Sequence, residues 1–143
     1  MNLSKAAKLV RVSNAVAAGT TTVNSASVDM QGFHGVAFAV EFGAITAGAA
    51  TATKLQGSHD GTTWEDLEGT AQTVADTEDD KLFVVDVARP MHRYLRAVVS
   101  RATQNAAVDS ILAIAYGADR EPVALDPSVA GVELHLSPAA GTP

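Results

Sequence analysis

Short runs that alternate apolar and polar residues, separated by turn-forming residues at intervals of about ten positions, dominate this sequence and restrict what it can fold into. In a β-strand successive side chains point to opposite faces, so an alternating run buries one face and exposes the other. The runs are rich in Val, Thr and Phe, and clusters of Gly, Asn, Asp and Thr lie between them. The sequence therefore predicts an all-β protein, an antiparallel β-sandwich of jelly-roll-like type.

The clearest alternation runs through residues 35–42 and predicts a strand with one buried face. Val36, Phe38, Val40 and Phe42 fall on that face, and smaller or polar residues fall on the other. We expect this face to lie in the core.

Further strands are expected wherever the same alternation recurs. They cover residues 7–12, 20–29, 50–57, 64–67, 81–87, 93–101 and 108–116. Residues 35–42 and 50–57 are expected to pair in a meander, and residues 93–101 and 108–116 to pair as a hairpin. Residues 81–87 are predicted to form a buried strand.

The chain divides by composition into one domain and two arms. Residues 1–14 are predicted to be an N-terminal arm and residues 15–117 the β-sandwich domain. Residues 118–143 carry four of the five prolines and are predicted to be an extended C-terminal arm, because proline removes a backbone donor. Its one alternating run, residues 132–136, cannot bury much of itself and is expected to lie on its own domain or on a neighbour.

Bulk composition excludes several classes of protein. The absence of cysteine rules out disulfides, thiolate metal sites and cysteine nucleophiles. A net charge of −6 argues against nucleic-acid binding, which needs a basic face. No apolar run approaches the roughly twenty residues that cross a bilayer, and the first residues lack the apolar stretch of a signal peptide, so neither membrane insertion nor ordinary secretion is expected.

Catalytic signatures are missing from the sequence as well. His34, His59, His92 and His135 lie far apart, without the close spacing of a compact metal site. The sequence holds neither a serine nucleophile elbow nor a phosphate-binding loop. We therefore predict no enzymatic activity, no catalytic residues, no metal and no cofactor.

Eight of the 16 acidic residues lie between positions 60 and 80, where no Lys or Arg intervenes. Several carboxylates in neighbouring loops suit a calcium site, because hard cations prefer oxygen ligands. The other interpretation is a solvated rim that keeps subunits soluble. The order of ligands in an EF-hand is absent, which favours the rim.

Contacts with a partner are expected at three places. Lys5, Lys8 and Arg11 make the N-terminal arm basic, which suggests directional docking, although basic residues are also common on flexible termini. Tyr94 and Arg96 are expected on the outer face of their strand, and both residue types are enriched at interfaces. The alternating run of the C-terminal arm adds a third set: Val132, Leu134 and Leu136.

Trp64 is the one tryptophan and follows an Asp-Gly turn. A tryptophan beside a turn can form a stacking platform for a sugar ring, or it can close one end of a sandwich. We favour the second interpretation, because a chain with seven large aromatic residues can hardly spare the largest from its core.

Three stretches together resemble a known pattern: residues 28–36 (VDMQGFHGV), 55–64 (LQGSHDGTTW) and 92–99 (HRYLRAVV). Their order resembles that in the small β-sandwich structural proteins of tailed bacteriophages, over roughly residues 20–117. Discoidin-like and other jelly-roll modules share the last two stretches. The resemblance implies the fold more directly than the role.

Within that group, the resemblance implies a capsid decoration, or cement, protein of the virion. Such a protein is assembled in the host bacterial cytoplasm, binds the outer surface of the phage head as a homotrimer, and has the major capsid protein as its partner. It offers no catalytic residues. Two alternatives stay open: a carbohydrate-binding or other β-sandwich module of a phage tail or baseplate, and a calcium-dependent adhesion or hydrolase accessory domain.

Overall fold

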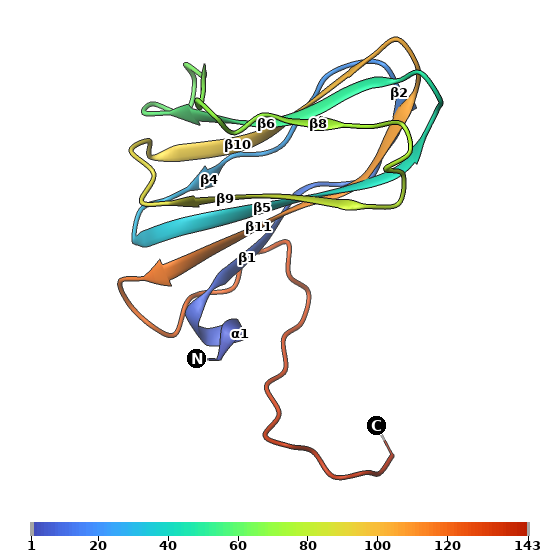
Figure 1. Ribbon diagram of the computed structural model, residues 1–143. Coiled ribbons are helices and arrows are strands. Elements are labelled where there is room, and N and C mark those ends of the chain that lie inside the picture. The colour runs from blue at the N-terminus through green and yellow to red at the C-terminus, as the bar shows by residue number, and fades with distance from the viewer. Residues whose placement is uncertain (1, 143) are drawn as a thin grey trace.

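The computed structural model describes residues 2–142 as two antiparallel β-sheets packed face to face (Figure 1). One sheet, called sheet A here, has the order β1 (Lys8–Ser13), β11 (Ala106–Ala118), β5 (Phe33–Ile45) and β9 (Leu82–Ala88), with β2 (Val16–Gly19) also pairing with β11. A short helix, α1 (Leu3–Ala6), precedes β1.

The other sheet, sheet B, is centred on β10 and β6. It consists of β3 (Val23–Asn24), β4 (Val28–Asp29), β10 (Tyr94–Ala102), β6 (Ala50–Ser58), β7 (Glu65–Asp66) and β8 (Gln72–Val74). Both β3 and β4 pair with β10, and both β7 and β8 pair with β6. Along the chain the strands pass repeatedly from one sheet to the other, which is the jelly-roll arrangement. The predicted fold class is therefore confirmed.

The core lies between the sheets and is built from the faces that the alternation predicted. Val36, Phe38, Val40 and Phe42 on β5 are at most 2% exposed. Leu55 on β6 and Leu95, Ala97 and Val99 on β10 cover them from the other sheet and are fully buried. Burying each large aliphatic or aromatic side chain stabilises the fold by about 1.5–3 kcal/mol.

Two predicted strand pairings are wrong. Strands β5 and β6 do not form a meander, because β5 belongs to sheet A and β6 to sheet B. Strands β10 and β11 do not form a hairpin either: β10 pairs with β6, and β11 pairs with β5. In both places the turn carries the chain across the sandwich, because each strand already has neighbours on both sides within its own sheet.

The predicted buried strand, β9, is instead the edge strand of sheet A. Its inner residues are half-buried, and Leu82 and Val84 on its outer side are 54% and 47% exposed. The strand expected at residues 20–29 lies at the edge of sheet B and is broken into β3 and β4. Between them Ser25 accepts a hydrogen bond from the Ala97 amide at its side-chain oxygen.

The predicted N-terminal arm of residues 1–14 is not free over its described part. Residues 3–6 form α1, and β1 pairs with β11 from Lys8 to Ser13. Val12 on β1 is 4% exposed and belongs to the core. Burial of this apolar residue and the ladder of backbone hydrogen bonds make the segment part of the sandwich.

A buried arginine closes the end of the sandwich where β10 turns into β11. Arg101 is 5% exposed, and its guanidinium donates to the carbonyl oxygens of Ala17, Thr21 and Ala106 at 2.6–2.9 Å. A buried charge is costly unless hydrogen bonds compensate it. Here the three carbonyls compensate the charge, and the arginine in turn ties β2 and the following loop to β11.

Candidate interaction surfaces

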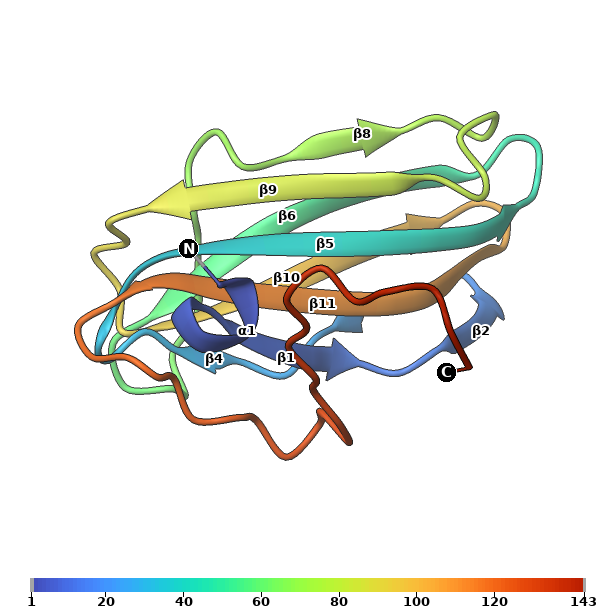
Figure 2. The same cartoon turned by 90° about the horizontal axis from the view of Figure 1, so that it is seen from below.

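The C-terminal arm has a fixed part and a projecting part. Residues 119–129, here called the arm root, run along the side of sheet A next to α1 and β1 and are bound to this N-terminal segment (Figure 2). The Val123 amide donates to the carbonyl of Lys5 at 2.8 Å, and the Arg11 amide donates to Oγ of Ser128 at 2.9 Å. These contacts hold the arm against the sheet up to residue 129.

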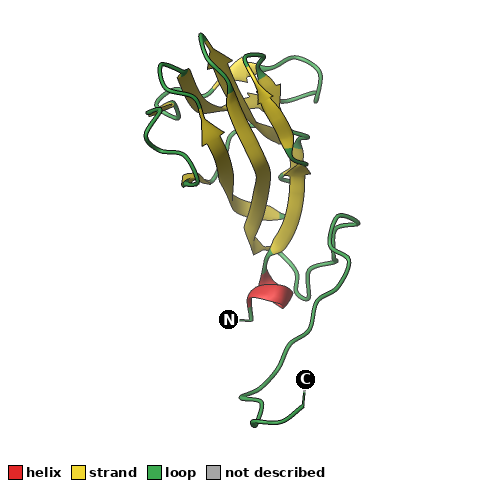
Figure 3. Cartoon of the chain, turned by 90° about the vertical axis from the view of Figure 1, so that its right-hand side faces the viewer, coloured by secondary structure: helices red, strands yellow, loops and turns green. Residues whose placement is uncertain are grey.

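Beyond the root, residues 130–142, here called the distal arm, extend away from the sandwich (Figure 3). They contain neither helix nor strand, so the short strand expected at residues 132–136 is not formed. Val132, Leu134 and Leu136 are 37%, 51% and 92% exposed. The structure thus places these three predicted contact residues on a projecting segment that its own domain does not cover.

The three predicted basic contact residues have different surroundings. Nζ of Lys8 lies 3.4 Å from a carboxylate oxygen of Asp126 in the arm root, so Lys8 holds the arm. Burial raises the pKa of Asp126, but hydrogen bonds from Ser128 and the charge of Lys8 outweigh burial and lower it. Lys5 on α1 and Arg11 on β1 are exposed. The pairing of Lys8 with an acid weakens the interpretation of this segment as a purely basic docking element.

The outer face of sheet A carries an aliphatic patch, with the charged residues Arg11, Glu41 and Asp86 around it. The register places outward-facing residues of the four main strands side by side: Leu9 on β1, Leu112 and Ile114 on β11, Ala37 and Ala39 on β5, and Leu82 and Val84 on β9. A groove of about 260 Å³ lies where this face meets the arm root, and it is lined by Leu9, Leu112 and Val129 among others. The arm root therefore covers part of an apolar face.

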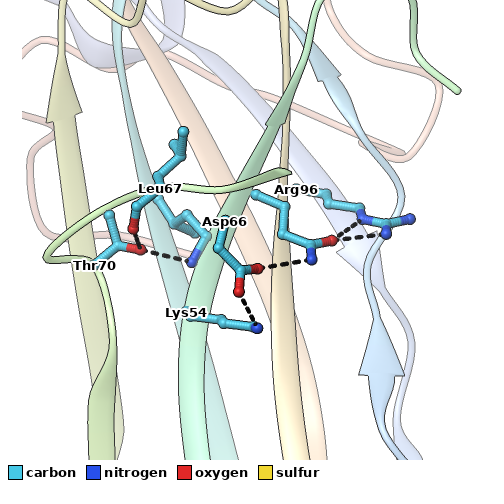
Figure 4. Close-up of polar contacts among 7 residues, drawn as sticks. Lys54, Asp66, Leu67, Thr70 and Arg96 are labelled. Atoms are coloured by element: carbon cyan, nitrogen blue, oxygen red, sulfur yellow. Dashed lines mark hydrogen bonds and ion pairs between the residues drawn. The ribbon is translucent and has the colours of Figure 1, made fainter. Parts of the chain in front are cut away.

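The outer face of sheet B is polar in its centre (Figure 4). Arg96 donates to Oε1 of Gln56 at 2.7 and 2.9 Å, and Gln56 donates to Asp66 at 2.8 Å. Lys54 donates to the other oxygen of Asp66 at 2.6 Å. Hydrogen bonds from Lys54 and Gln56 lower the pKa of the Asp66 carboxyl. This network joins β10, β6 and β7 across the sheet.

Trp64 lies on this outer face and not in the core, so the prediction that it closes the sandwich is wrong. The guanidinium carbon of Arg96 stands 4.3 Å from the centroid of the Trp64 ring. A cation over a tryptophan face is attracted by the ring's π-electrons. Tyr94, the other predicted contact on this strand, is half-buried, and Arg93 stands over its ring at 5.0 Å.

The acidic stretch does not form one cluster. Residues 60–68 lie at one end of β6 and residues 76–80 at the other, because β8 runs back along β6 between them. Asp60 accepts hydrogen bonds from the amides of Thr62 and Thr63, from the Thr63 hydroxyl and from the Ser58 hydroxyl. Those from the two threonines are the main cause of the strongly lowered pKa of Asp60. The Asp60 carboxylate thus fixes the conformation of the turn that follows β6 through these hydrogen bonds.

Two histidines and one glutamate meet at the same end of sheet B. Nε2 of His92 lies 2.5 Å from Oε1 of Glu65, and the rings of His59 and His92 stack with their centroids 4.5 Å apart. One nitrogen or oxygen atom from each residue lies within 4.8 Å of the others. Within residues 2–142, no other three His, Asp or Glu side chains converge in this way. Sequence spacing missed the group because 27 positions separate Glu65 from His92.

Comparisons with known proteins agree with the fold. No protein-family model matches the chain, and no curated protein matches its sequence. A solved structure, the crystal structure of PBSX exported protein XepA, superposes with a TM-score of 0.55 at 18% identity. The superposition covers 96% of this chain and 45% of that protein, so the chain spans less than half of its structural neighbour. At this identity the likeness shows a shared fold.

Within residues 2–142, no helix has the length and apolar character needed to span a bilayer.

Proposed function

We propose that the protein is a virion structural protein, a decoration or cement subunit that binds the outer surface of a phage head and stabilises the shell. The observation that carries the proposal is the distal arm. It leaves the sandwich from a fixed root and presents Val132, Leu134 and Leu136 to the surroundings. An exposed alternating segment gains both main-chain hydrogen bonds and side-chain pockets when it joins the edge of another sheet.

The fold supports this role without specifying it. Jelly rolls are common in viral capsid and lectin domains. The structural neighbour XepA carries the name of the phage PBSX, which agrees with the resemblance of three sequence stretches to tailed-phage structural proteins. Fold alone never establishes function; the distal arm and the aliphatic patch on the outer face of sheet A are the features that support this role.

Repeated weak contacts suit such a subunit. A single distal arm, residues 130–142, buries too little surface for a stable complex by itself. In a closed homotrimer on a symmetric shell, each further contact with the major capsid protein forms at high effective concentration, which raises the overall affinity by a factor of about 10²–10⁴. The proposed partners are therefore copies of this chain and the major capsid protein.

The test uses phage heads that lack the protein and purified full-length chain. Full-length protein is expected to co-sediment with heads and to raise the temperature at which they release DNA. A variant with Val132, Leu134 and Leu136 all changed to Ser is expected to stay folded and lose binding. Met91→Ser is the matched control, since Met91 is 88% exposed and lies outside the arm. Equal binding by the triple variant, or heads equally robust without the protein, would refute the proposal.

A tail or baseplate module that binds carbohydrate is the second candidate. It is favoured by the position of Trp64, which is only half-buried and lies outside the core. Full-length protein that sediments with tails and not with heads, together with glycan-array binding that Trp64→Ala abolishes, would replace the first proposal with this one. Arg96 over the Trp64 ring leaves less of that ring open to a sugar.

A further inference from the structure

The group of His59, Glu65 and His92 has the composition of a transition-metal site. Two imidazoles and one carboxylate form a ligand set used by zinc enzymes with three protein ligands. Imidazole nitrogen suits zinc, copper and nickel, whereas calcium and magnesium prefer oxygen ligands. The prediction that the protein binds no metal rested on the wide spacing of the histidines in the sequence. The fold brings two of these histidines, His59 and His92, next to Glu65.

His92 is the fixed member of the group. Its side chain is 11% exposed, and its ring packs on the backbone of Gly57 in β6. His59 follows the end of β6, at the start of the turn that Asp60 holds through four hydrogen bonds. Glu65 begins β7 and pairs with Gly57 across the ladder. Three backbone segments that are themselves fixed thus carry the three ligands.

The distances fit an ion after small side-chain movements. Ligand atoms on a tetrahedral zinc ion stand about 3.4 Å apart when each bond is about 2.1 Å long. Glu65 must therefore move away from His92 by roughly 1 Å, and the His59 ring, which stacks on His92, must turn so that its nitrogen faces the same ion. Both are exposed, so neither movement disturbs the core. A hollow of about 340 Å³ lies beside the two histidines and is lined by His59 and His92 but not by Glu65.

We propose that His59, Glu65 and His92 bind one divalent transition-metal ion, with zinc as the first choice, and that the ion staples the turn after β6 to the loop before β10. The proposal does not depend on a role in a virion.

The chain supplies its own matched control. His34 lies 2.9 Å from Asp119, with both side chains more than 60% exposed, so that pair offers one imidazole and one carboxylate without a second histidine. A metal held by any exposed histidine-carboxylate pair would also use His34. A metal held by the proposed site needs all three of its ligands.

The experiment titrates zinc chloride into untagged, chelator-treated full-length protein by isothermal calorimetry near pH 7.5, and repeats the titration with cobalt to record the absorption of tetrahedral Co²⁺. One ion per chain and a raised melting temperature are expected. His59→Ala and Glu65→Gln should each weaken binding at least about tenfold, while His34→Ala should bind like the unchanged protein.

The variants were chosen so that loss of folding does not obscure the result. His59 and Glu65 are exposed, and circular dichroism of both variants is expected to match the unchanged protein. No binding of zinc by the unchanged protein at millimolar concentration would overturn the proposal. Equal binding by His59→Ala, or an equal loss in His34→Ala, would overturn it too, because the ion would then be held elsewhere.

Discussion

The ring of His92 lies directly against the backbone of Gly57: a Cβ atom at position 57 would stand 2.5 Å from Cγ of the imidazole. A similar arrangement occurs on sheet A, where a Cβ atom on Gly35 of β5 would overlap the ring of Tyr116. Tyr116 reaches across β5 to donate its hydroxyl to Asp86 on β9 at 2.6 Å, and this hydrogen bond is the main cause of its raised pKa. In both sheets, the missing side chain of a strand glycine thus leaves the space that a ring from a neighbouring segment occupies.

Gly57→Ala is therefore expected to destabilise the protein. The added methyl must displace the His92 ring, and overpacking of this kind costs about 1–3 kcal/mol. The free energy of unfolding in urea measures the loss. Gly131→Ala serves as control, because a Cβ atom there meets nothing within 4 Å. A Gly57→Ala protein as stable as the control would show that the His92 ring can move away from position 57 without loss of stability.

Arg101→Met is expected to cost about 2–4 kcal/mol, because it leaves the buried carbonyl of Ala106 and the part-buried carbonyls of Ala17 and Thr21 without their donor. Urea unfolding measures the change, and the exposed Arg120→Met should alter stability by less than about 0.5 kcal/mol. Equal stability of the two variants would mean that water replaces the guanidinium at this end of the sandwich.

Asp60 is expected to make stability depend on pH. Its pKa is lower in the folded than in the unfolded protein, so the ionised carboxylate stabilises the fold. That contribution is complete above the unfolded value of about 4 and is lost as the pH falls toward the folded value. The melting temperature of Asp60→Ala should lie below that of the unchanged protein at pH 7, and the gap should narrow below about pH 4.

The control for this experiment is Asp79→Ala, which removes an exposed carboxylate from the other end of β6. Its melting temperature should follow that of the unchanged protein throughout. A gap for Asp60→Ala that is constant from pH 7 to pH 2.5 would contradict the assigned role of the ionised form.

Trp64 and Arg96 are expected to be energetically coupled. A double-mutant cycle with Trp64→Leu and Arg96→Met should give an interaction free energy of about 0.5–1 kcal/mol. Since the chain has one tryptophan, its fluorescence reports this contact alone, and Arg96→Met should shift the emission to longer wavelength. Arg93→Met, which affects the neighbouring Tyr94, should leave the emission unchanged. Additive single-variant effects would exclude the coupling.

The arm root is expected to loosen when its contact with β1 is removed. Ser128→Ala takes the acceptor from the Arg11 amide, and loss of a hydrogen bond worth about 1 kcal/mol should speed exchange of that amide by about fivefold. Hydrogen exchange followed by NMR measures the rate. The distal-arm variant Ser137→Ala should leave it unchanged, and an unchanged rate in Ser128→Ala would show that water replaces the hydroxyl.

The faces of the strands could be predicted from the sequence, because an alternation with period two is a local property. The alternate residues that the pattern placed inward are buried: Val36, Phe38, Val40 and Phe42 on β5, and Leu95, Ala97 and Val99 on β10. The partners of the strands could not be predicted in the same way. A hairpin and a crossing between two sheets both need a turn, and the residues around Gly48 and Thr103 are compatible with either.

The candidate sites depend still more on contacts between distant residues. Composition suggested a core position for Trp64, but the competing attraction of Arg96 on the outer face was not visible from residue counts. The group of His59, Glu65 and His92 likewise forms only because Gly57 in β6 pairs with both β7 and β10. The extended C-terminal arm could be predicted from its prolines, but the short strand expected at residues 132–136 is not formed.

The crossing turn between β10 and β11 offers a site for carrying foreign peptides. Residues 102–105 are exposed, and Thr103 already has a φ of 69°, a conformation that glycine adopts more readily. This turn lies at the far end of β11 from α1 and the arm root (Figure 1). An epitope flanked by glycines and inserted there would be displayed without touching either terminus. A peptide fused to the C-terminus would instead extend the distal arm, which is the segment proposed to bind the shell.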